Sequence, residues 1–108
     1  MVYYFTGRYN LAIADYSKAI EINPSYEMSY NNRGNAYSSR KQYDLAIADF
    51  SKAAELDPKD FISYINRADA YSDIGQIALA VKDLNLVIEQ SDNPNFVKIA
   101  REKLGKLK

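Results

Sequence analysis

The chain has 108 residues, enough for one domain, and its 14 basic side chains balance 14 acidic ones. It contains neither cysteine nor histidine, which excludes disulfides, thiolate chemistry, and the side chain that most often serves as general base or metal ligand near neutral pH. The balanced charge argues against nucleic acid as a partner, and no apolar run is long enough to predict membrane insertion. Since no secretory signal is recognised either, the cytoplasm is the expected compartment.

An internal repeat organises the sequence. Residues 9–24 match residues 43–58 at 11 of 16 positions, and residues 29–38 resemble residues 63–72 at the same spacing. A fainter third copy contains Leu79, which follows Leu45 at the same period. Self-similarity at a fixed period of about 34 residues is typical of solenoid folds.

The first copy of the repeat is shorter than the others. Residues 1–6 are too few for a full helix of about three turns. Either the chain is a piece of a longer array, or it opens with a short helical stub that is followed by a turn at Gly7. A second helix is then expected to end at Asn23-Pro24, because proline cannot continue a helix. Such an opening leaves one apolar side of the first repeat uncovered, which makes self-association through this end a hypothesis.

The next two copies each predict a pair of helices. In the middle copy, Tyr30, Arg33, Gly34 and Tyr37 recur at steps of three and four residues, which is typical of one stripe of a helix. A turn is expected after this stripe, at the position equivalent to Gly7. The second helix has its own apolar stripe, formed by Ala46, Ile47, Phe50, Ala53 and Ala54.

The last stretch predicts a capping helix over residues 95–107. A solenoid needs a terminal element with one polar face to cover its last repeat. The side expected to pack on the third copy consists of Phe96, Ile99, Ala100, Lys103 and Leu107. The basic residues expected on the outer face are Lys98, Arg101, Lys103, Lys106 and Lys108.

These residues resemble the tetratricopeptide repeat family. The family pattern has Trp, Leu-Gly and Tyr in the first helix, then Ala, Phe, Ala and Pro in the second. This chain departs from it with Tyr30 in place of Trp and Arg33 in place of Leu. The resemblance implies an all-α fold, a right-handed α-solenoid of antiparallel helix pairs with nearly three repeats and a C-terminal capping helix. The expected segments of this single domain are 1–24 (partial first repeat), 25–58, 59–93 and 94–108 (capping helix).

The resemblance also implies a concave groove, lined by the first helix of each repeat, that holds a peptide or a partner helix. Asparagine suits such a groove because its amide both donates and accepts hydrogen bonds to a peptide backbone. The residues expected to line the groove are Met28, Asn31, Asn32, Asn35, Ile62, Ile65, Asn66, Asp69 and Asp73. The alternative is structural, with the asparagines at 32 and 66 bonded to neighbouring helices and the isoleucines at 62 and 65 packed on the adjacent repeat.

One branch of the family binds the C-terminal carboxylate of a partner between two Asn and several Lys or Arg. Asn35 and Asn66 match the two Asn positions. A carboxylate needs donated positive charge to offset its desolvation, and little is offered here. The cationic positions hold Asn31, Phe96 and Ala100, or Lys98 and Glu102 if the capping helix is shifted by two residues.

Two arginines and three aspartates recur with the repeat and predict structural ion pairs. Arg33 and Arg67 fall on the packing side of the first helix, and Asp15, Asp49 and Asp83 fall on the second. If such a pair only satisfies itself, a leucine at position 67 is expected to be tolerated.

The sequence therefore favours a non-catalytic module for protein–protein interaction, a scaffold that binds a peptide or a partner helix. No catalytic, metal or cofactor-binding residues are assigned, and the partner is expected to be a protein or peptide. The alternative hypothesis is a structural or self-assembly segment of a longer array or of a homo-oligomer.

Overall fold

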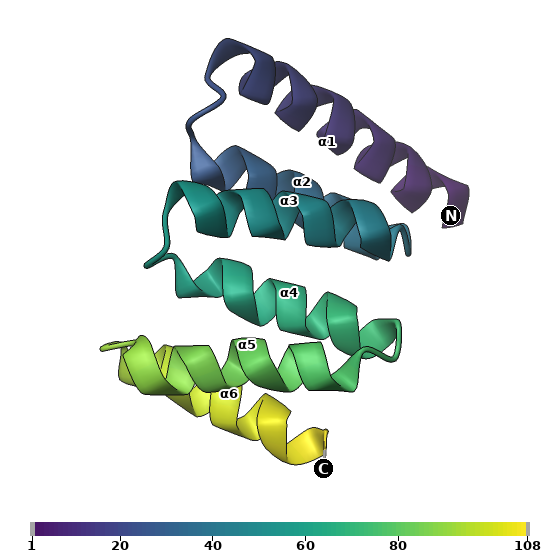
Figure 1. Ribbon diagram of the computed structural model, residues 1–108. Coiled ribbons are helices and arrows are strands. Elements are labelled where there is room, and N and C mark those ends of the chain that lie inside the picture. Colours follow the sequence, from purple (N-terminus) through teal and green to yellow (C-terminus); the bar gives the residue numbers. More distant parts are fainter. Residues whose placement is uncertain (1, 108) are drawn as a thin grey trace.

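Six α-helices stack in chain order (Figure 1). The computed structural model describes residues 2–107, with side chains from residue 7 onward. Within these residues there is no strand. Short turns connect consecutive helices, which pack against each other and form an all-α solenoid. The helices are α1 (Val2–Ile22), α2 (Glu27–Ser39), α3 (Tyr43–Leu56), α4 (Phe61–Asp73), α5 (Ile77–Gln90) and α6 (Pro94–Lys106).

The six helices form two layers with different spacing. In the inner layer, α2 contacts α4 and α4 contacts α6. In the outer layer no comparable contact joins α1 to α3 or α3 to α5 within residues 2–107. A stack curves toward its more closely spaced layer, so the inner layer of α2, α4 and α6 lies on the concave side.

The core of each complete repeat lies between its two helices. Ala46, Phe50 and Ala53 of α3 are at most 1% exposed. Gly34 of α2 lies directly against the Phe50 ring, because a Cβ atom at position 34 would be 2.6 Å from Phe50 Cε1. In the next repeat Ala68 packs in the same cluster as the smaller Leu84. Small residues on the first helix thus let the second helix approach closely.

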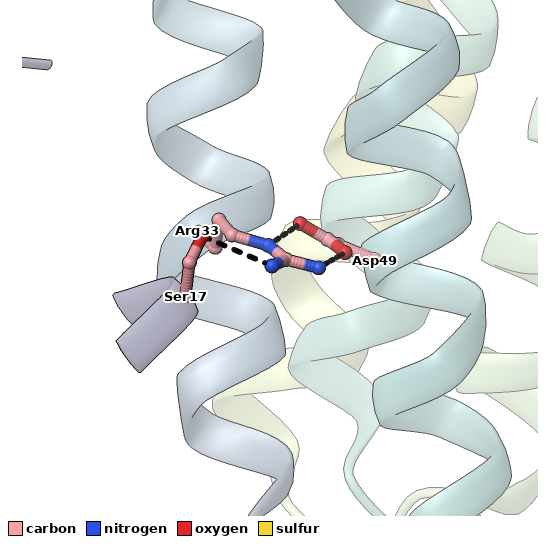
Figure 2. A network of polar contacts seen from close by, with 3 residues as sticks. All are labelled: Ser17, Arg33 and Asp49. Atoms are coloured by element: carbon pink, nitrogen blue, oxygen red, sulfur yellow. Dashed lines mark hydrogen bonds and ion pairs between the residues drawn. The ribbon is translucent and has the colours of Figure 1, made fainter. Parts of the chain in front are cut away.

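Arginine–aspartate pairs form as predicted at Asp49 and Asp83, though not at Asp15 among residues 7–107, and each arginine also reaches the preceding repeat. Figure 2 shows the arrangement around Arg33. Arg33 on α2 donates from Nε and Nη2 to the two carboxylate oxygens of Asp49 on α3, both at 2.8 Å. Its Nη1 donates to Ser17 Oγ on α1 at 3.1 Å. Arg67 repeats the arrangement with Asp83 and Ser51. Each arginine therefore fixes three helices in register.

Hydrogen bonding to the paired aspartate raises the pKa of both arginines above its ordinary value, against the opposing effect of burial. The guanidinium carbon of Arg33 lies 5.8 Å from the ring centroids of both Tyr30 and Tyr37. Such cation–π contacts further stabilise the charged form of the arginine. The arginines consequently stay charged throughout the range in which the protein is handled.

Turns with left-handed backbone join the two helices of each complete repeat. Lys41 has φ 63° and Gly75 has φ 81°. This conformation lets the amide of the following residue close back on the first helix: Gln42 N–H donates to the Tyr37 carbonyl at 2.9 Å. Gly75 suits this backbone better than Lys41 does, because glycine has no Cβ. The prolines at 24 and 58 lie in the turns between repeats.

The turn expected at Gly7 is wrong, because α1 is continuous from Val2 to Ile22. In the complete repeats a full first helix holds the turn in place, and residues 2–6 are too few to provide one. Continuing the existing helix gains one backbone hydrogen bond per residue, which outweighs the cost of roughly 1 kcal/mol for a helical glycine.

The capping helix α6 covers the third repeat, with two corrections to its predicted faces. Ala100 is fully buried and Phe96 packs against the same core cluster as Leu107. Ile99, expected on the packed side, is 39% exposed. Lys103, expected both on the packed side and on the outer face, bonds inward to α4, so only its assignment to the outer face is wrong. Lys108 lies outside the described residues. No helix within residues 2–107 is both long enough and apolar enough to cross a membrane.

Candidate peptide-binding groove

The concave side of α2 and α4 carries two matching stripes of side chains. Helical spacing of three and four residues places each set on one face of its helix. Their members are exposed or partly exposed: Met28, Asn32 and Asn35 on α2, and Ile62, Asn66, Asp69 and Asp73 on α4. The face therefore combines side-chain amides with apolar contacts from Met28 and Ile62, each more than a third exposed.

Two residues predicted for the groove are buried instead, which corrects that part of the prediction. Asn31 is 2% exposed and Ile65 is 6% exposed. The two occupy the same position in successive repeats, and that position faces the next helix of the inner layer. Asn31 Nδ2 donates to Asp60 Oδ2 at 2.8 Å and to Ser63 Oγ at 2.9 Å on the α4 side. Ile65 packs in the cluster that contains Ala100 of α6.

An ion pair that the sequence did not predict joins α4 to α6 across the concave side. Lys103 Nζ lies 3.0 Å from Asp69 Oδ1 and donates to Oδ2 at 3.1 Å. The pair is exposed to solvent, so its contribution to stability is small. Lys103 thus neutralises the charge of Asp69 at the groove surface. Asp73, one turn further along α4, is also exposed. The sequence signal was the spacing of one repeat period between positions 69 and 103.

A small hollow lies beside this ion pair. Its volume is about 150 Å³, and Leu84 of α5 is among the residues that line it. The remaining lining residues are Ala68, Asp69, Ser72, Lys103, Lys106 and Leu107. The hollow is lined by both apolar and charged side chains, and its volume suits one side chain of a partner rather than a whole small molecule.

The cationic positions of a carboxylate-binding groove are not available on this face. Asn31 and Ala100 are buried, and Phe96 is partly buried against the core. Lys98 and Glu102, the residues of the shifted register, are exposed on α6 and line its outward surface together with Arg101. Asn35 and Asn66 are thus left without the cations of such a groove, and Lys103 of α6 is bonded to Asp69.

Sequence comparison matches three segments of the chain to repeat profiles of a single family. Residues 28–60 and 50–82 match profiles described as "Tetratricopeptide repeat", and residues 2–39 match one described as "TPR repeat". Together the three segments extend from residue 2 to residue 82. No curated protein matched the chain over its sequence.

Solved structures with the same arrangement of helices include two peptide-binding domains. The first TPR of Spaghetti (RPAP3), bound to the HSP90 peptide SRMEEVD, is 27% identical with a TM-score of 0.83, over 97% of this chain and 81% of that one. The TPR2B domain of yeast Sti1, in a complex with pHsp70, is 28% identical with a TM-score of 0.82, over 97% and 83%. The secretion chaperone SycD of Yersinia enterocolitica, 22% identical with a TM-score of 0.86 over 96% and 82%, shows the fold alone.

Proposed function

Because the chain belongs to the tetratricopeptide repeat family, we propose that it is a non-catalytic module that binds a peptide or a partner helix on its concave side. The observation that carries the proposal is the pair of matching stripes on α2 and α4, each of which has an apolar side chain near the N-terminal end of the helix followed by polar side chains that include asparagine. Domains of the same fold that share 27% and 28% identity are solved with HSP90 and Hsp70 ligands. The proposed contact residues are Met28, Asn32, Asn35, Ile62, Asn66, Asp69 and Asp73.

The chemistry of the face favours a ligand read through its backbone. An asparagine amide offers two donors and an acceptor, so Asn35 and Asn66 can pair with a peptide group whatever its side chain. Met28 and Ile62 lie toward the N-terminal ends of their helices and would contact an apolar residue of the ligand. Both an extended segment and a helix fit this description.

An acidic C-terminal tail is not the ligand we expect. The buried Asn31 and Ala100 and the outward Lys98 leave Asn35 and Asn66 without the cations that compensate for desolvation of a carboxylate. Titration of the chain with the peptide SRMEEVD should give no saturable binding. Tight, saturable binding would show that two amides and the Asp69-bonded Lys103 suffice for an acidic ligand.

Affinity capture with matched variants tests the binding face. We would compare the wild type, Asn66→Arg on α4 and Asn85→Arg on α5, using extracts of the source cells. Both changes add the same charge and bulk, but only position 66 lies on the concave side. A partner retained by the wild type and Asn85→Arg but lost by Asn66→Arg supports the proposal; equal retention by all three contradicts it. Circular dichroism would first establish that the variants are folded.

The proposal includes a cytoplasmic location, which cell fractionation would test.

Self-assembly is the second candidate function. It is favoured by the outer surface of α1, where Leu11 is 68% exposed and Ile22 is 77% exposed. Sedimentation over a wide concentration range separates the two candidates, since a constant monomer mass leaves the binding module as the function.

A further inference from the structure

One side of α1 repeats the residues that α3 and α5 bury. At four positions of the repeat, the residues of α3 and α5 are at most 5% exposed. In α1 the aspartate of this set is exposed and the other three residues are only partly buried. The equivalent residues are Ala12, Asp15, Tyr16 and Ala19 in α1; Ala46, Asp49, Phe50 and Ala53 in α3; and Ala80, Asp83, Leu84 and Val87 in α5.

The structure shows what covers this set in the complete repeats. In both cases the cover is a helix with a tyrosine three residues before an arginine, a small residue directly after it, and a second tyrosine four residues after it. The arginine makes a two-bond ion pair with the aspartate, and the small residue lies at the core between the helices. Within residues 7–107, no arginine of such a helix pairs with Asp15 of α1: Arg33 of α2 pairs with Asp49 and reaches α1 only at Ser17.

The exposure of the neighbouring residues agrees with an uncovered side of α1 among residues 7–107. Leu11 is 68% exposed, whereas its equivalents Leu45 and Leu79 are 46% and 41% exposed. Asp15 has no ion pair or side-chain hydrogen bond among residues 7–107, although Asp49 and Asp83 each have both. Asp15 and its apolar neighbour Leu11 are therefore both uncovered, at the place where an arginine-bearing helix would lie.

We propose that this side of α1 is a second docking surface, separate from the concave groove, for a partner helix that carries the pattern Tyr-x-x-Arg-Gly-x-x-Tyr. The partner's arginine pairs with Asp15, and its tyrosines flank that pair. Glycine follows the arginine because Tyr16 is aromatic, like Phe50, and Phe50 leaves no room for a Cβ on the residue that faces it. Alanine at that position matches a leucine, as Ala68 does Leu84.

A second copy of this chain is a poor source of the helix. The remaining helix of the inner-layer type is α6, whose arginine is Arg101 in the register of the repeat. Around it the same register places Lys98 and Gly105 where the pattern has tyrosines, and Glu102 where it has glycine. A glutamate pressed against Tyr16 would bury a carboxylate without a partner, which is costly. The surface therefore fits a helix from a different polypeptide segment.

The test uses the intact chain and a synthetic helix of the required pattern. The probe is a fluorescein-labelled peptide of residues 26–40, which carries Tyr30, Arg33, Gly34 and Tyr37. Fluorescence anisotropy should show saturable binding to the wild-type chain. Asp15→Asn in the chain and Arg33→Leu in the peptide should each weaken binding about ten-fold, because each removes a charge-assisted hydrogen-bonded pair. Combined, they should weaken it little further, since the two changes break one interaction.

Matched controls separate this surface from non-specific attraction. Glu21→Gln removes the same charge from the same helix, at a position that is also exposed in α3 as Glu55, and should leave binding unchanged. Gly34→Ala in the peptide should weaken binding. Absence of saturable binding overturns the proposal, and so does equal weakening by Asp15→Asn and Glu21→Gln. Sedimentation of the chain alone gives a further check. A dimer that is lost in the Asp15→Asn variant would assign the surface to a second copy of the chain and overturn the proposal of a separate partner helix. None of these outcomes bears on Asn66 and the concave groove.

Discussion

The middle repeat and the N-terminal helix carry nearly the same outer-helix sequence but reach different degrees of burial. Phe50 of α3 is 1% exposed, whereas its equivalent Tyr16 is only partly buried. Asp49 makes two hydrogen bonds to Arg33, whereas its equivalent Asp15 is exposed. The difference lies in the neighbours, because α3 packs between α2 and α4, whereas within residues 2–107 α1 packs only against α2. The burial of a repeat residue is thus set by the helices on both sides.

The largest expected difference between the two regions concerns their aromatic residues. Phe50→Ala should lower the free energy of unfolding by about 3–5 kcal/mol, because it leaves a cavity in a closely packed core. Tyr16→Ala should cost about 1 kcal/mol, the typical effect of a substitution outside a packed core. Urea denaturation followed by circular dichroism gives both values. Equal losses of stability in the two variants would mean that Tyr16 is packed as tightly as Phe50, which would contradict the difference in burial between α1 and α3.

The second contrast concerns the ion pairs. Arg67→Leu leaves the Asp83 carboxylate, 4% exposed, without its partner and should cost about 3 kcal/mol. The double variant Arg67→Leu and Asp83→Leu should recover most of this loss, so the predicted tolerance of a leucine at position 67 applies only when the aspartate is replaced too. Asp15→Asn in α1 should change stability by no more than about 0.5 kcal/mol.

The pH dependence follows from the raised pKa of Arg67. A group whose pKa is higher in the folded state contributes its full stabilisation below its ordinary pKa and loses it as the pH rises through the folded value. For an arginine both values lie in the strongly alkaline range. The destabilisation caused by Arg67→Leu should therefore be the same at pH 7 and pH 9, as measured by urea denaturation. A loss that shrinks between these two pH values would show that the arginine does not act as a permanently charged partner.

A third experiment tests the close approach of the first helix of a repeat to the second. Gly34→Ala should cost about 1–3 kcal/mol, because the added Cβ overlaps the Phe50 ring. Adding Phe50→Leu should restore part of the loss, since the next repeat already combines Ala68 with Leu84. Thermal unfolding of the single and double variants gives the answer; a Gly34→Ala variant as stable as the wild type would contradict the tight packing.

The smallest expected effects distinguish two glycines that occupy the same position in the first and third copies of the repeat. Gly75 has φ 81°, so Gly75→Ala forces a side chain into a left-handed backbone and should cost about 1 kcal/mol. Gly7 lies inside α1, so Gly7→Ala should stabilise the chain by about 0.5–1 kcal/mol through higher helix propensity. Differential thermal unfolding measures both. Destabilisation by Gly7→Ala would indicate a turn at this position rather than a continuous helix.

The repeat made most of the fold predictable from the sequence. Equivalent positions of successive repeats share their neighbours, so the stripe around Ala46 and Phe50 identified the core, and the recurrence of arginine and aspartate identified the pairs. Gly7 broke the rule because a turn depends on the full helix before it as well as on its own residue. The period alone could not show that residues 2–6 would extend α1.

The groove was less predictable because it depends on small rotations about a helix axis. Neighbouring residues differ by about 100° around a helix, which separates the partly exposed Asn32 from the buried Asn31. Which of the two points into the groove depends on the distance to α4, and the sequence does not contain that distance. Lys103 was predicted for both the packed and the outer face of α6 for a similar reason, since a long side chain can reach across to Asp69 from the edge of α6.

Hydrogen exchange of the chain, with and without its captured partner, tests the central claim that the concave side is the binding face. The account predicts added protection of backbone amides in α2 and α4, where the stripes of Asn35 and Asn66 lie, and the same exchange in α1 and α5. Protection confined to α1, or to the outer surface of α5 or α6, would contradict it.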